Sequence, residues 1–322
     1  MEYRKLGNSD LQVSRLAMGS FHVYDRMTMD EVVELLLAAR AAGINWFDVG
    51  HYTSGVNVED RVSTTDIRFA WAREQAGIKR EDYIHTQKLW YGDPRPSFKA
   101  QLAESLPRAQ VDYADIGIYN PGTAGYFGQK SDMKDIVTQF AHLVEIGWLH
   151  HWGFNHAYPW EIREAIEFAD KEGMPKPIVM QIEYNAVTRE QAEDPALMEV
   201  AKEFNLDYQV TNTLGVGVLL GRPAEAATRP TGYGKMDAAA ANAAEQFKAI
   251  AASVDATPAQ LAIAFALTHP LAKAALFGAS KLSQLQDNLG GPALLERLGA
   301  EAIRDLLKDL PQDPEQLGPY DH

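Results

Sequence analysis

Short apolar runs alternate with longer amphipathic stretches along the whole chain, and each apolar run ends in polar residues. The apolar runs have the length of strands and the longer stretches have the spacing of helices. Strands are expected at residues 15–18, 44–47, 83–87, 114–119, 148–154, 177–182, 207–210 and 274–277. Helices are expected at residues 28–43, 59–75, 97–109, 132–146, 160–172, 195–204, 238–253 and 257–268.

The two ends of the chain extend this pattern. Residues 2–14 have the alternation of a short β-hairpin that turns at residues 7–10. Extra helices are expected between residues 284 and 307, and the acidic, Pro-rich tail from Pro311 is expected to be irregular. Thr28, with Glu31 three residues later, forms the sequence pattern of a capping box and marks the start of the first helix.

Eight strand-then-helix units predict a single (β/α)8 TIM barrel over residues 1–322, with an N-terminal β-hairpin and extra C-terminal helices. Strands that alternate with helices pair in parallel through right-handed crossovers. An open doubly wound sheet is the main alternative. Against it, no Gly-x-Gly-x-x-Gly follows the first strand, and polar strand ends occur in all eight units. In a barrel those ends meet at one mouth, where active sites lie.

Composition narrows the class of protein. A hydrophobic content of 46% and an aromatic content of 10% are typical of a well-cored soluble protein. The absence of Cys excludes disulfides and thiol chemistry, and together with a polar N-terminus it favours a cytoplasmic location without a membrane span. A formal charge of −14 argues against nucleic acid as the main partner and says nothing about a small-molecule substrate. No metal-ligand spacing occurs, and the sequence carries no signal for an oligomeric state.

Two strand ends carry the strongest chemical signal. The strand at 44–47 leads into Asp48 and then into His51, Tyr52 and Thr53, and the strand at 83–87 leads into Lys88. A buried carboxylate and a buried ammonium are tolerated when they pair, and such a pair shifts the pKa of its neighbours. A structural ion pair beside ordinary turn residues is the alternative interpretation.

Several segments together resemble the aldo-keto reductases nearly from end to end. They are residues 45–48 (Asn-Trp-Phe-Asp), 87–90 (Gln-Lys-Leu-Trp), 181–185 (Gln-Ile-Glu-Tyr-Asn), 257–262 and 278–288. The resemblance implies the barrel fold and a nicotinamide dinucleotide cofactor, NADP with NAD as the second choice. It also implies a carbonyl or hydroxyl substrate.

The family's chemistry uses an Asp, a Lys, a Tyr and a His, and this chain keeps two of the four. Asp48 and Lys88 match, whereas the Tyr position holds Thr53 and the His position holds Asn120. We therefore expect an altered catalytic set of Asp48, Tyr52, Lys88 and Asn120. In this hypothesis Tyr52 turns inward and donates the proton, Lys88 lowers the phenol pKa, and Asn120 holds the substrate oxygen. His51 is the next candidate for the donor.

The resemblance also assigns cofactor and substrate positions. At the adenosine end the chain keeps Lys281, Asp287 and Asn288, whereas Gln284 replaces an Arg often found in the family. Thr211 replaces the aromatic residue that usually stacks on the nicotinamide. The expected cofactor-binding residues are Gly19, Ser20, Asp48, Asn155, His156, Gln181, Thr211, Asn212, Leu214, Gly278, Ala279, Ser280, Lys281, Gln284, Asp287 and Asn288. The expected substrate-binding residues are His51, Thr53, Trp90, Tyr91 and Tyr126.

Three functions are compatible with this pattern. The first is an NADP-linked reductase of carbonyl compounds with a non-standard proton donor. The second is a redox-neutral lyase or epimerase that keeps its cofactor bound and acts through a transient ketone. The third is an NADP-binding protein without catalysis. The retained Asp48 and Lys88 favour an enzyme, because an ion pair is costly to bury without a purpose.

Overall fold

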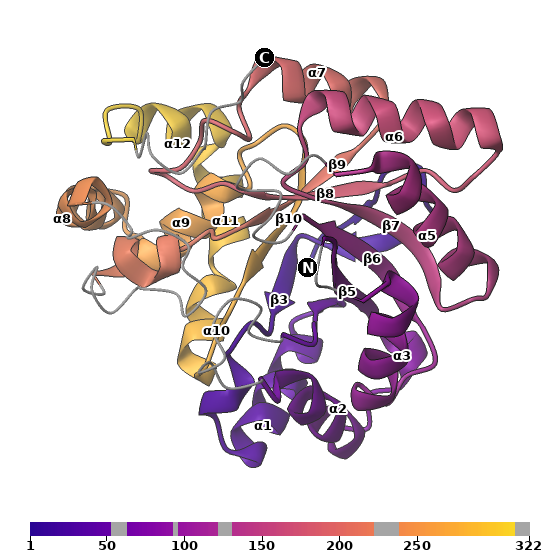
Figure 1. Ribbon diagram of the computed structural model, residues 1–322. Coiled ribbons are helices and arrows are strands. Elements are labelled where there is room, and N and C mark those ends of the chain that lie inside the picture. Colours follow the sequence, from indigo (N-terminus) through magenta and orange to yellow (C-terminus); the bar gives the residue numbers. More distant parts are fainter. Residues whose placement is uncertain (53–62, 93–95, 122–130, 222–237, 313–322) are drawn as a thin grey trace.

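Eight parallel strands close into a barrel, and helices surround it on the outside (Figure 1). The structure is a computed structural model that describes residues 1–52, 63–92, 96–121, 131–221 and 238–312, with no side-chain description for 238–242. Around the barrel the strand order is β10-β3-β4-β5-β6-β7-β8-β9, so the last strand pairs with the first and no edge remains. The predicted (β/α)8 barrel is therefore confirmed.

The observed strands lie where the apolar runs predicted them, with ends that differ by a few residues. Several continue through the polar residue that was expected to follow them, so that Asp48 and Lys88 lie inside strands. The barrel strands are β3 (Leu16–Gly19), β4 (Trp46–Asp48), β5 (Ile84–Trp90), β6 (Ala114–Asn120), β7 (Leu149–Asn155), β8 (Val179–Glu183), β9 (Asp207–Thr211) and β10 (Ala272–Phe277).

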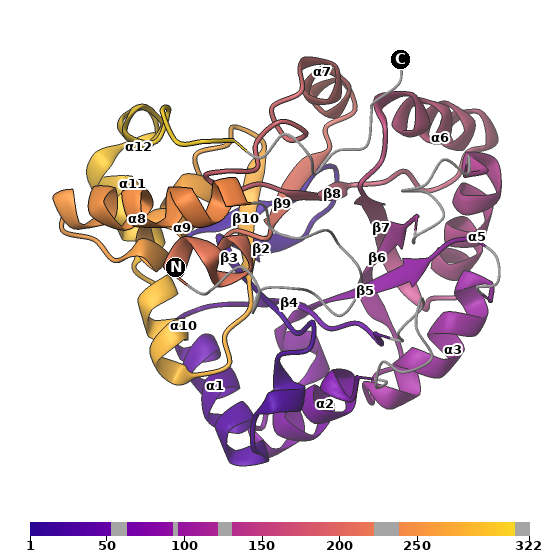
Figure 2. The same cartoon turned by 60° about the vertical axis from the view of Figure 1, so that its left-hand side comes forward.

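The helices follow the amphipathic stretches, and α1, α2, α3, α5 and α6 succeed one another around the barrel in both views (Figures 1 and 2). The predicted helix start at residue 59 lies outside the described residues, and the described α2 begins at Thr65. The helices are α1 (Met29–Ala41), α2 (Thr65–Gln75), α3 (Phe98–Arg108), α5 (Met133–Glu145), α6 (Pro159–Glu172), α7 (Pro195–Glu203), α8 (Ala238–Ser253), α9 (Pro258–Ala266), α10 (Leu282–Asn288), α11 (Gly291–Leu298) and α12 (Ala300–Leu306).

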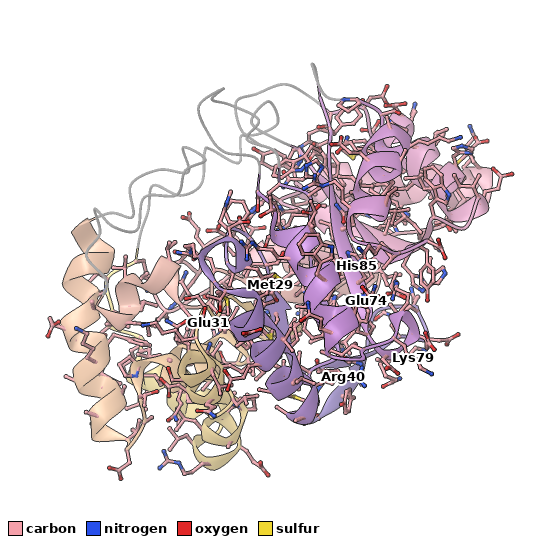
Figure 3. The ribbon with its side chains drawn as sticks, turned by 90° about the horizontal axis from the view of Figure 1, so that it is seen from below. Met29, Glu31, Arg40, Glu74, Lys79 and His85 are labelled. Atoms are coloured by element: carbon pink, nitrogen blue, oxygen red, sulfur yellow. The ribbon has the colours of Figure 1, made fainter. Side chains whose placement is uncertain are left out.

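Helix α1 begins at the predicted capping box. The Thr28 hydroxyl accepts from the Glu31 backbone N–H, and the Glu31 carboxylate accepts from the Thr28 N–H at 2.7 Å. Glu31 lies near the start of α1 and Arg40 near its end (Figure 3). Acidic groups at the start and basic groups at the end of a helix both stabilise its dipole.

The N-terminal hairpin closes the end of the barrel at which the strands begin. It consists of β1 (Tyr3–Lys5) and β2 (Gln12–Ser14), and its residues Leu6 and Val13 pack into the barrel lumen. The Gly7 N–H donates to Asp207 at 2.6 Å. Gly7 has a φ of +50°, and a Cβ there would clash with the backbone of Ile178, so the turn requires glycine.

The barrel lumen is apolar in its lower part, toward the amino ends of the strands, and polar in its upper part, toward their carboxyl ends. The lower part consists of side chains such as Trp46, Ile116, Ile118 and Val179, all of them buried. Because residues two apart on a strand face the same side, the residues that follow on the lumen side include Asp48 above Trp46 and Gln181 above Val179. Strand alternation thus changes the lumen from a packed core into a polar site at its mouth.

Two histidines are buried between the barrel and its helices. His85 on β5 packs beside Phe69, and its Nε2 lies 3.1 Å from the Val49 carbonyl oxygen. His269 follows α9, and its Nε2 lies 2.8 Å from the Ala192 carbonyl oxygen. Burial lowers the pKa of each imidazole to about 4, which keeps both rings neutral.

No single helix in the described part of the chain is long and apolar enough to cross a membrane. Residues Ala243–Ser253 and Pro258–Ala266 pass that test only as a pair, by length and composition, and the chain bends by 94° between them.

Candidate active site

A cavity of about 1140 Å³ lies at the carboxyl ends of the barrel strands. It brings together most of the residues that were expected to bind a cofactor or substrate, although these come from distant parts of the sequence. The predicted residues that line it are Gly19, Tyr52, Lys88, Trp90, Asn120, Asn155, His156, Gln181, Thr211, Asn212, Leu214, Gly278, Ser280, Gln284, Asp287 and Asn288.

The other predicted residues occupy different places. Asp48, Ser20 and Ala279 are buried next to lining residues rather than lining the cavity themselves. Lys281 is exposed where α10 begins. Thr53 and Tyr126 lie outside the described residues.

The floor of the site is built around the Asp48 carboxylate, whose residue is 1% exposed. Tyr52 donates its hydroxyl proton to Oδ1 at 3.1 Å. On the other oxygen, Gln181 donates from Nε2 at 2.7 Å, and the Lys88 Nζ lies 3.3 Å away. The expected Asp48–Lys88 pair is thus present. Three donors from three different elements hold one buried anion, which compensates the cost of removing it from water.

A second amide lies beside this group and was not anticipated. Gln181 donates from the same Nε2 to the Oε1 atom of Gln209 on β9 at 2.6 Å, and both residues are fully buried. With both amide protons engaged, the Gln181 Oε1 has no hydrogen-bond partner in the described part of the chain. Gln209 lies two positions before Thr211, so strand alternation alone could have placed it in the lumen.

Tyr52 turns inward, and its pKa is the opposite of what the sequence led us to expect. The residue is 3% exposed, lines the cavity, and packs edge-on against Phe21 with ring centroids 4.8 Å apart. Burial and the neighbouring Asp48 carboxylate raise the pKa of the Tyr52 phenol well above its ordinary value. The expectation that Lys88 lowers this pKa is wrong for this arrangement, since the Lys88 Nζ lies 5.9 Å from the ring centroid while Asp48 is in direct contact.

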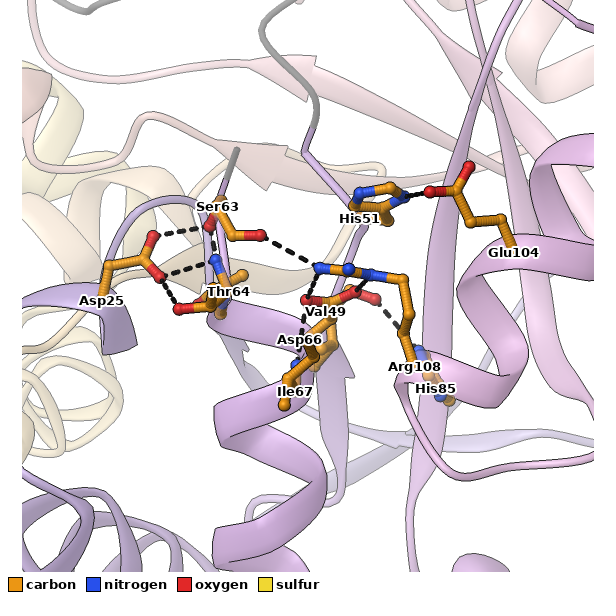
Figure 4. A network of polar contacts seen from close by, with 11 residues as sticks. Asp25, Val49, His51, Ser63, Thr64, Asp66, Ile67, His85, Glu104 and Arg108 are labelled. Atoms are coloured by element: carbon orange, nitrogen blue, oxygen red, sulfur yellow. Dashed lines mark hydrogen bonds and ion pairs between the residues drawn. The ribbon is translucent and has the colours of Figure 1, made fainter. Parts of the chain in front are cut away.

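His51 does not line the cavity, contrary to its expected role in binding substrate. Its Nδ1 lies 3.7 Å from Glu104 on α3, within a polar group that also includes Arg108 and Asp66 (Figure 4). Burial and the Arg108 guanidinium lower the pKa of His51. His51 and Tyr52 are consecutive, so the turn that directs Tyr52 into the cavity directs His51 toward α3.

Tyr91 is also placed away from the cavity. Its ring packs against Phe98 and Tyr119, with centroid separations of 6.1 and 6.2 Å. The preceding residue, Trp90, does line the cavity. Tyr91 follows the last residue of β5, so strand alternation did not fix which way its side chain points.

The loop after β3 contributes cavity residues that sequence reasoning missed, among them Phe21, His22 and Asp25. The Asp25 carboxylate accepts from the Thr64 N–H at 2.8 Å and lies 3.5 Å from the His22 Nδ1. The rule that all strand ends of a barrel meet at one mouth was the signal that could have found them.

The far end of the cavity is less tightly bonded within the protein. Asn288 is buried, but its Nδ2 has no hydrogen-bond partner among the described residues. Asp287 accepts from the Thr257 hydroxyl at 2.7 Å, and Gln284 accepts from the Ser280 N–H at 2.9 Å. The Asn288 Nδ2 thus lacks a protein partner within the described residues, and its residue lines the cavity.

This barrel has a buried carboxylate–ammonium pair beneath a cavity at its strand ends, and the aldo/keto reductase family model matches it over residues 15–305. The chain belongs to the aldo/keto reductase family, and this membership supports an oxidoreductase-type function.

Two plant proteins, each described as a probable voltage-gated potassium channel subunit beta, are similar over nearly the full length. The protein from Arabidopsis thaliana is 25% identical over 342 aligned positions, which cover 98% of this chain and 99% of the relative. The protein from Oryza sativa subsp. japonica is 25% identical over 344 positions, which cover 99% and 100%.

Proposed function

We propose that this protein is an oxidoreductase that binds NADP in the cavity and interconverts a carbonyl and a hydroxyl group on a small molecule. NAD is the alternative cofactor. The observation that carries the proposal is the Asp48 carboxylate held by Lys88, Tyr52 and Gln181 at the floor of the cavity. Such a group places a charged, proton-bearing side chain beside the space where an oxygen would gain charge.

The residues present fit a dinucleotide. Pockets for small-molecule ligands typically have volumes of roughly 300–1,000 Å³, and this cavity of about 1140 Å³ is larger. Among the described residues, the acceptor Gln181 Oε1 on its floor and the donor Asn288 Nδ2 at its other end have no hydrogen-bond partner. A carboxamide carries N–H donors and an adenine carries ring-nitrogen acceptors, so the two ends of a nicotinamide adenine dinucleotide complement these atoms.

In this proposal Gln181 and Asn155 hold the nicotinamide end, and Asp287 and Asn288 hold the adenosine end. When bound, the reduced nicotinamide supplies a hydride equivalent. Asn120 donates an amide N–H to the substrate oxygen, which stabilises the charge that develops there. Trp90 supplies an apolar wall that orients the substrate and helps to exclude water.

Two measurements test the proposal. The first is a fluorescence titration of the purified protein with NADPH and NADH, together with analysis of any nucleotide released on denaturation. The second follows NADPH oxidation with 4-nitrobenzaldehyde and with 9,10-phenanthrenequinone as carbonyl probes. We expect saturable NADPH binding and net reduction of at least one probe, and failure to bind either dinucleotide would contradict the proposal.

The same measurements separate the two other functions. A nicotinamide nucleotide that stays bound through purification, without net oxidation of NADPH, would support a redox-neutral lyase or epimerase. Free exchange of the nucleotide without any turnover would support a dinucleotide-binding protein. A bound nucleotide that exchanges freely and is oxidised by a carbonyl probe would support the reductase.

A further inference from the structure

The proposed reaction needs a proton donor, and two described groups on the cavity floor carry a proton that can be transferred. They are the Tyr52 hydroxyl and the Lys88 ammonium, which both contact the Asp48 carboxylate. Neither of the family's usual partners is present, because Thr53 and Asn120 replace the Tyr and the His. The contacts of the two remaining groups differ in a way that decides between them.

Tyr52 is poorly arranged to give its proton away. Its hydroxyl already donates to Asp48 Oδ1 at 3.1 Å, so the proton points to the carboxylate. Loss of that proton would leave a phenolate and a carboxylate in contact inside a buried site. Two like charges in such a place disfavour ionisation of the second group. Burial and this neighbouring carboxylate together raise the pKa of Tyr52.

Lys88 is arranged differently. Its side chain is 16% exposed and lines the cavity, whereas its partner Asp48 is 1% exposed. An ammonium has three N–H donors, so one can face Asp48 while another faces the cavity. Lys88 lies two residues before Trp90, which pairs with Asn120 on the neighbouring strand β6. The ammonium and the Asn120 amide therefore border the same part of the cavity.

We propose that the Lys88 ammonium itself is the proton donor and that Tyr52 serves to keep Asp48 ionised. This assignment rests on the proposed function. In the step, the carbonyl carbon gains a hydride from a dihydronicotinamide and the C–O π bond breaks. The oxygen takes one proton from Nζ, so that one C–H and one O–H bond form. Lys88 becomes a neutral amine and regains its proton from water before the next turnover.

The contacts of Asp48 fit this step. After Lys88 has given up its proton, Asp48 still accepts from Tyr52 and from Gln181. The carboxylate therefore keeps hydrogen bonds from two neutral donors while Lys88 is a neutral amine. Tyr52 acts here as a positioning residue rather than as an acid.

Two histidines also line the cavity, and both have partners away from the floor. The His22 Nδ1 lies 3.5 Å from Asp25 in the loop after β3. The His156 Nδ1 lies 3.2 Å from Gln191. Both come from loops, whereas Lys88 comes from inside a strand, where its position is set by backbone pairing on both sides.

Chemical rescue of Lys88→Ala tests the assignment, with NADPH as the reductant and 4-nitrobenzaldehyde as the probe. We expect turnover to fall by ~10² or more, as for loss of a general acid. Added methylammonium should raise the turnover of the Lys88→Ala variant by at least about tenfold, because it brings an N–H acid into the space left by the side chain. Tetramethylammonium is the matched control, since it carries the same charge and no N–H.

Two substitutions complete the test. Lys88→Arg keeps the positive charge, but a guanidinium does not lose its proton in proteins, so we expect a loss similar to that of Lys88→Ala. Tyr52→Phe keeps the ring and removes the hydroxyl, and we expect turnover to fall by less than about tenfold. The NADPH dissociation constant, measured by fluorescence, should stay within about threefold in all variants, and circular dichroism checks that each one folds.

Each outcome bears on the proposal. Rescue by tetramethylammonium, or an active Lys88→Arg combined with an inactive Tyr52→Phe, would overturn the assignment and make Tyr52 the donor. A wild-type protein that binds NADPH but reduces neither carbonyl probe would count against both the proposed reductase and this assignment. If the wild-type protein binds no dinucleotide at all, the proposed function itself fails.

Discussion

The two ends of the cavity are built in different ways. At the reacting end, the Asp48 carboxylate accepts from Tyr52 and Gln181 and pairs with Lys88, so its oxygens are satisfied by the protein alone. At the adenosine end, Asn288 has an Nδ2 without a partner among the described residues, and Lys281 is exposed. The Asp48 carboxylate is therefore satisfied within the fold, although the Gln181 Oε1 beside it has no partner in the described part of the chain, whereas the Asp287 carboxylate accepts from a single hydroxyl.

The difference follows from the elements that carry the residues. Asp48, Lys88 and Gln181 lie on three strands of the barrel, where backbone hydrogen bonds hold each Cα in place. Lys281 immediately precedes α10 and Asn288 is its last residue, and this helix follows the last strand and contributes to the other end of the cavity. Chemistry needs side chains that are held in place before substrate arrives, whereas affinity for a large ligand can come from groups that become ordered on binding.

Substitution of Asp48 by Asn is expected to have the largest effect, and it tests whether the two ends of the cavity differ in how much they depend on contacts within the protein. It leaves the Lys88 ammonium without its counter-charge, and breaking a buried pair costs about 3–5 kcal/mol of unfolding free energy. Asp287→Asn is the matched control at the adenosine end, where the carboxylate is half-buried and accepts from a single hydroxyl. We expect that control to cost about 1 kcal/mol or less.

Chemical denaturation of both variants measures these costs. Equal losses for Asp48→Asn and Asp287→Asn would contradict the view that the Asp48 carboxylate depends on its protein partners more than the Asp287 carboxylate does. Denaturation is chosen over activity because it reports on the pair even if the proposed function is wrong.

Lys281→Glu tests the adenosine end of the cavity through its affinity for a dinucleotide. In the proposed dinucleotide site this exposed residue at the start of α10 is the expected partner of the 2′-phosphate. We expect charge reversal to weaken NADPH binding by about tenfold, or about 1.4 kcal/mol. The affinity for NADH should change much less. An equal loss for both dinucleotides in a fluorescence titration would show that Lys281 does not contact that phosphate.

Gln209→Met tests whether dinucleotide binding at the reacting end depends on the buried Gln209 amide. The substitution keeps the approximate size but removes the acceptor of the Gln181 Nε2, which is worth about 1 kcal/mol. We expect dinucleotide affinity to fall by about fivefold because Gln181 is then held by Asp48 alone. Calorimetric titration of wild-type and variant proteins checks this. Unchanged affinity would mean that the Asp48 contact is sufficient to orient the Gln181 amide.

Asn288→Leu should give the smallest effect. Its unpaired Nδ2 is buried without compensation in the described structure, so an apolar side chain of similar size should be neutral or slightly stabilising. Dinucleotide affinity is expected to fall by only about threefold, because one neutral hydrogen bond is lost. A thermal melt with and without NADPH separates the two effects. Destabilisation without ligand would show that the Asn288 amide has a structural role.

Strand-borne parts of the site were predictable from the sequence. Asp48 and Lys88 follow apolar runs and Gln181 lies near the end of one, and parallel strands in a barrel bring their carboxyl ends to one mouth. Their proximity therefore needed no structure. Gln209 was within reach of the same reasoning, since it lies two residues before Thr211.

Turns and long-range electrostatics were not predictable in this way. Alternation does not extend past a strand end, so His51 was expected in the cavity and lies against α3 instead. Tyr91 follows the last residue of β5, so alternation could not place it either. The raised pKa of Tyr52 comes from its burial and from its contact with Asp48, and both are set by tertiary packing.

The two histidines buried around the barrel make folding of this protein sensitive to acid. An imidazole in the unfolded chain has a pKa near 6.5, whereas burial lowers that of His85 and His269 to about 4 in the folded state. Between about pH 4 and 6.5 the unfolded chain therefore binds protons at these imidazoles that the folded protein does not bind, so unfolding is accompanied by proton uptake. The stability that comes from keeping these rings neutral is complete above pH 6.5 and is lost progressively as the pH falls toward 4. Acidification from about pH 6.5 toward 4 should thus destabilise the folded protein through proton uptake at these two rings.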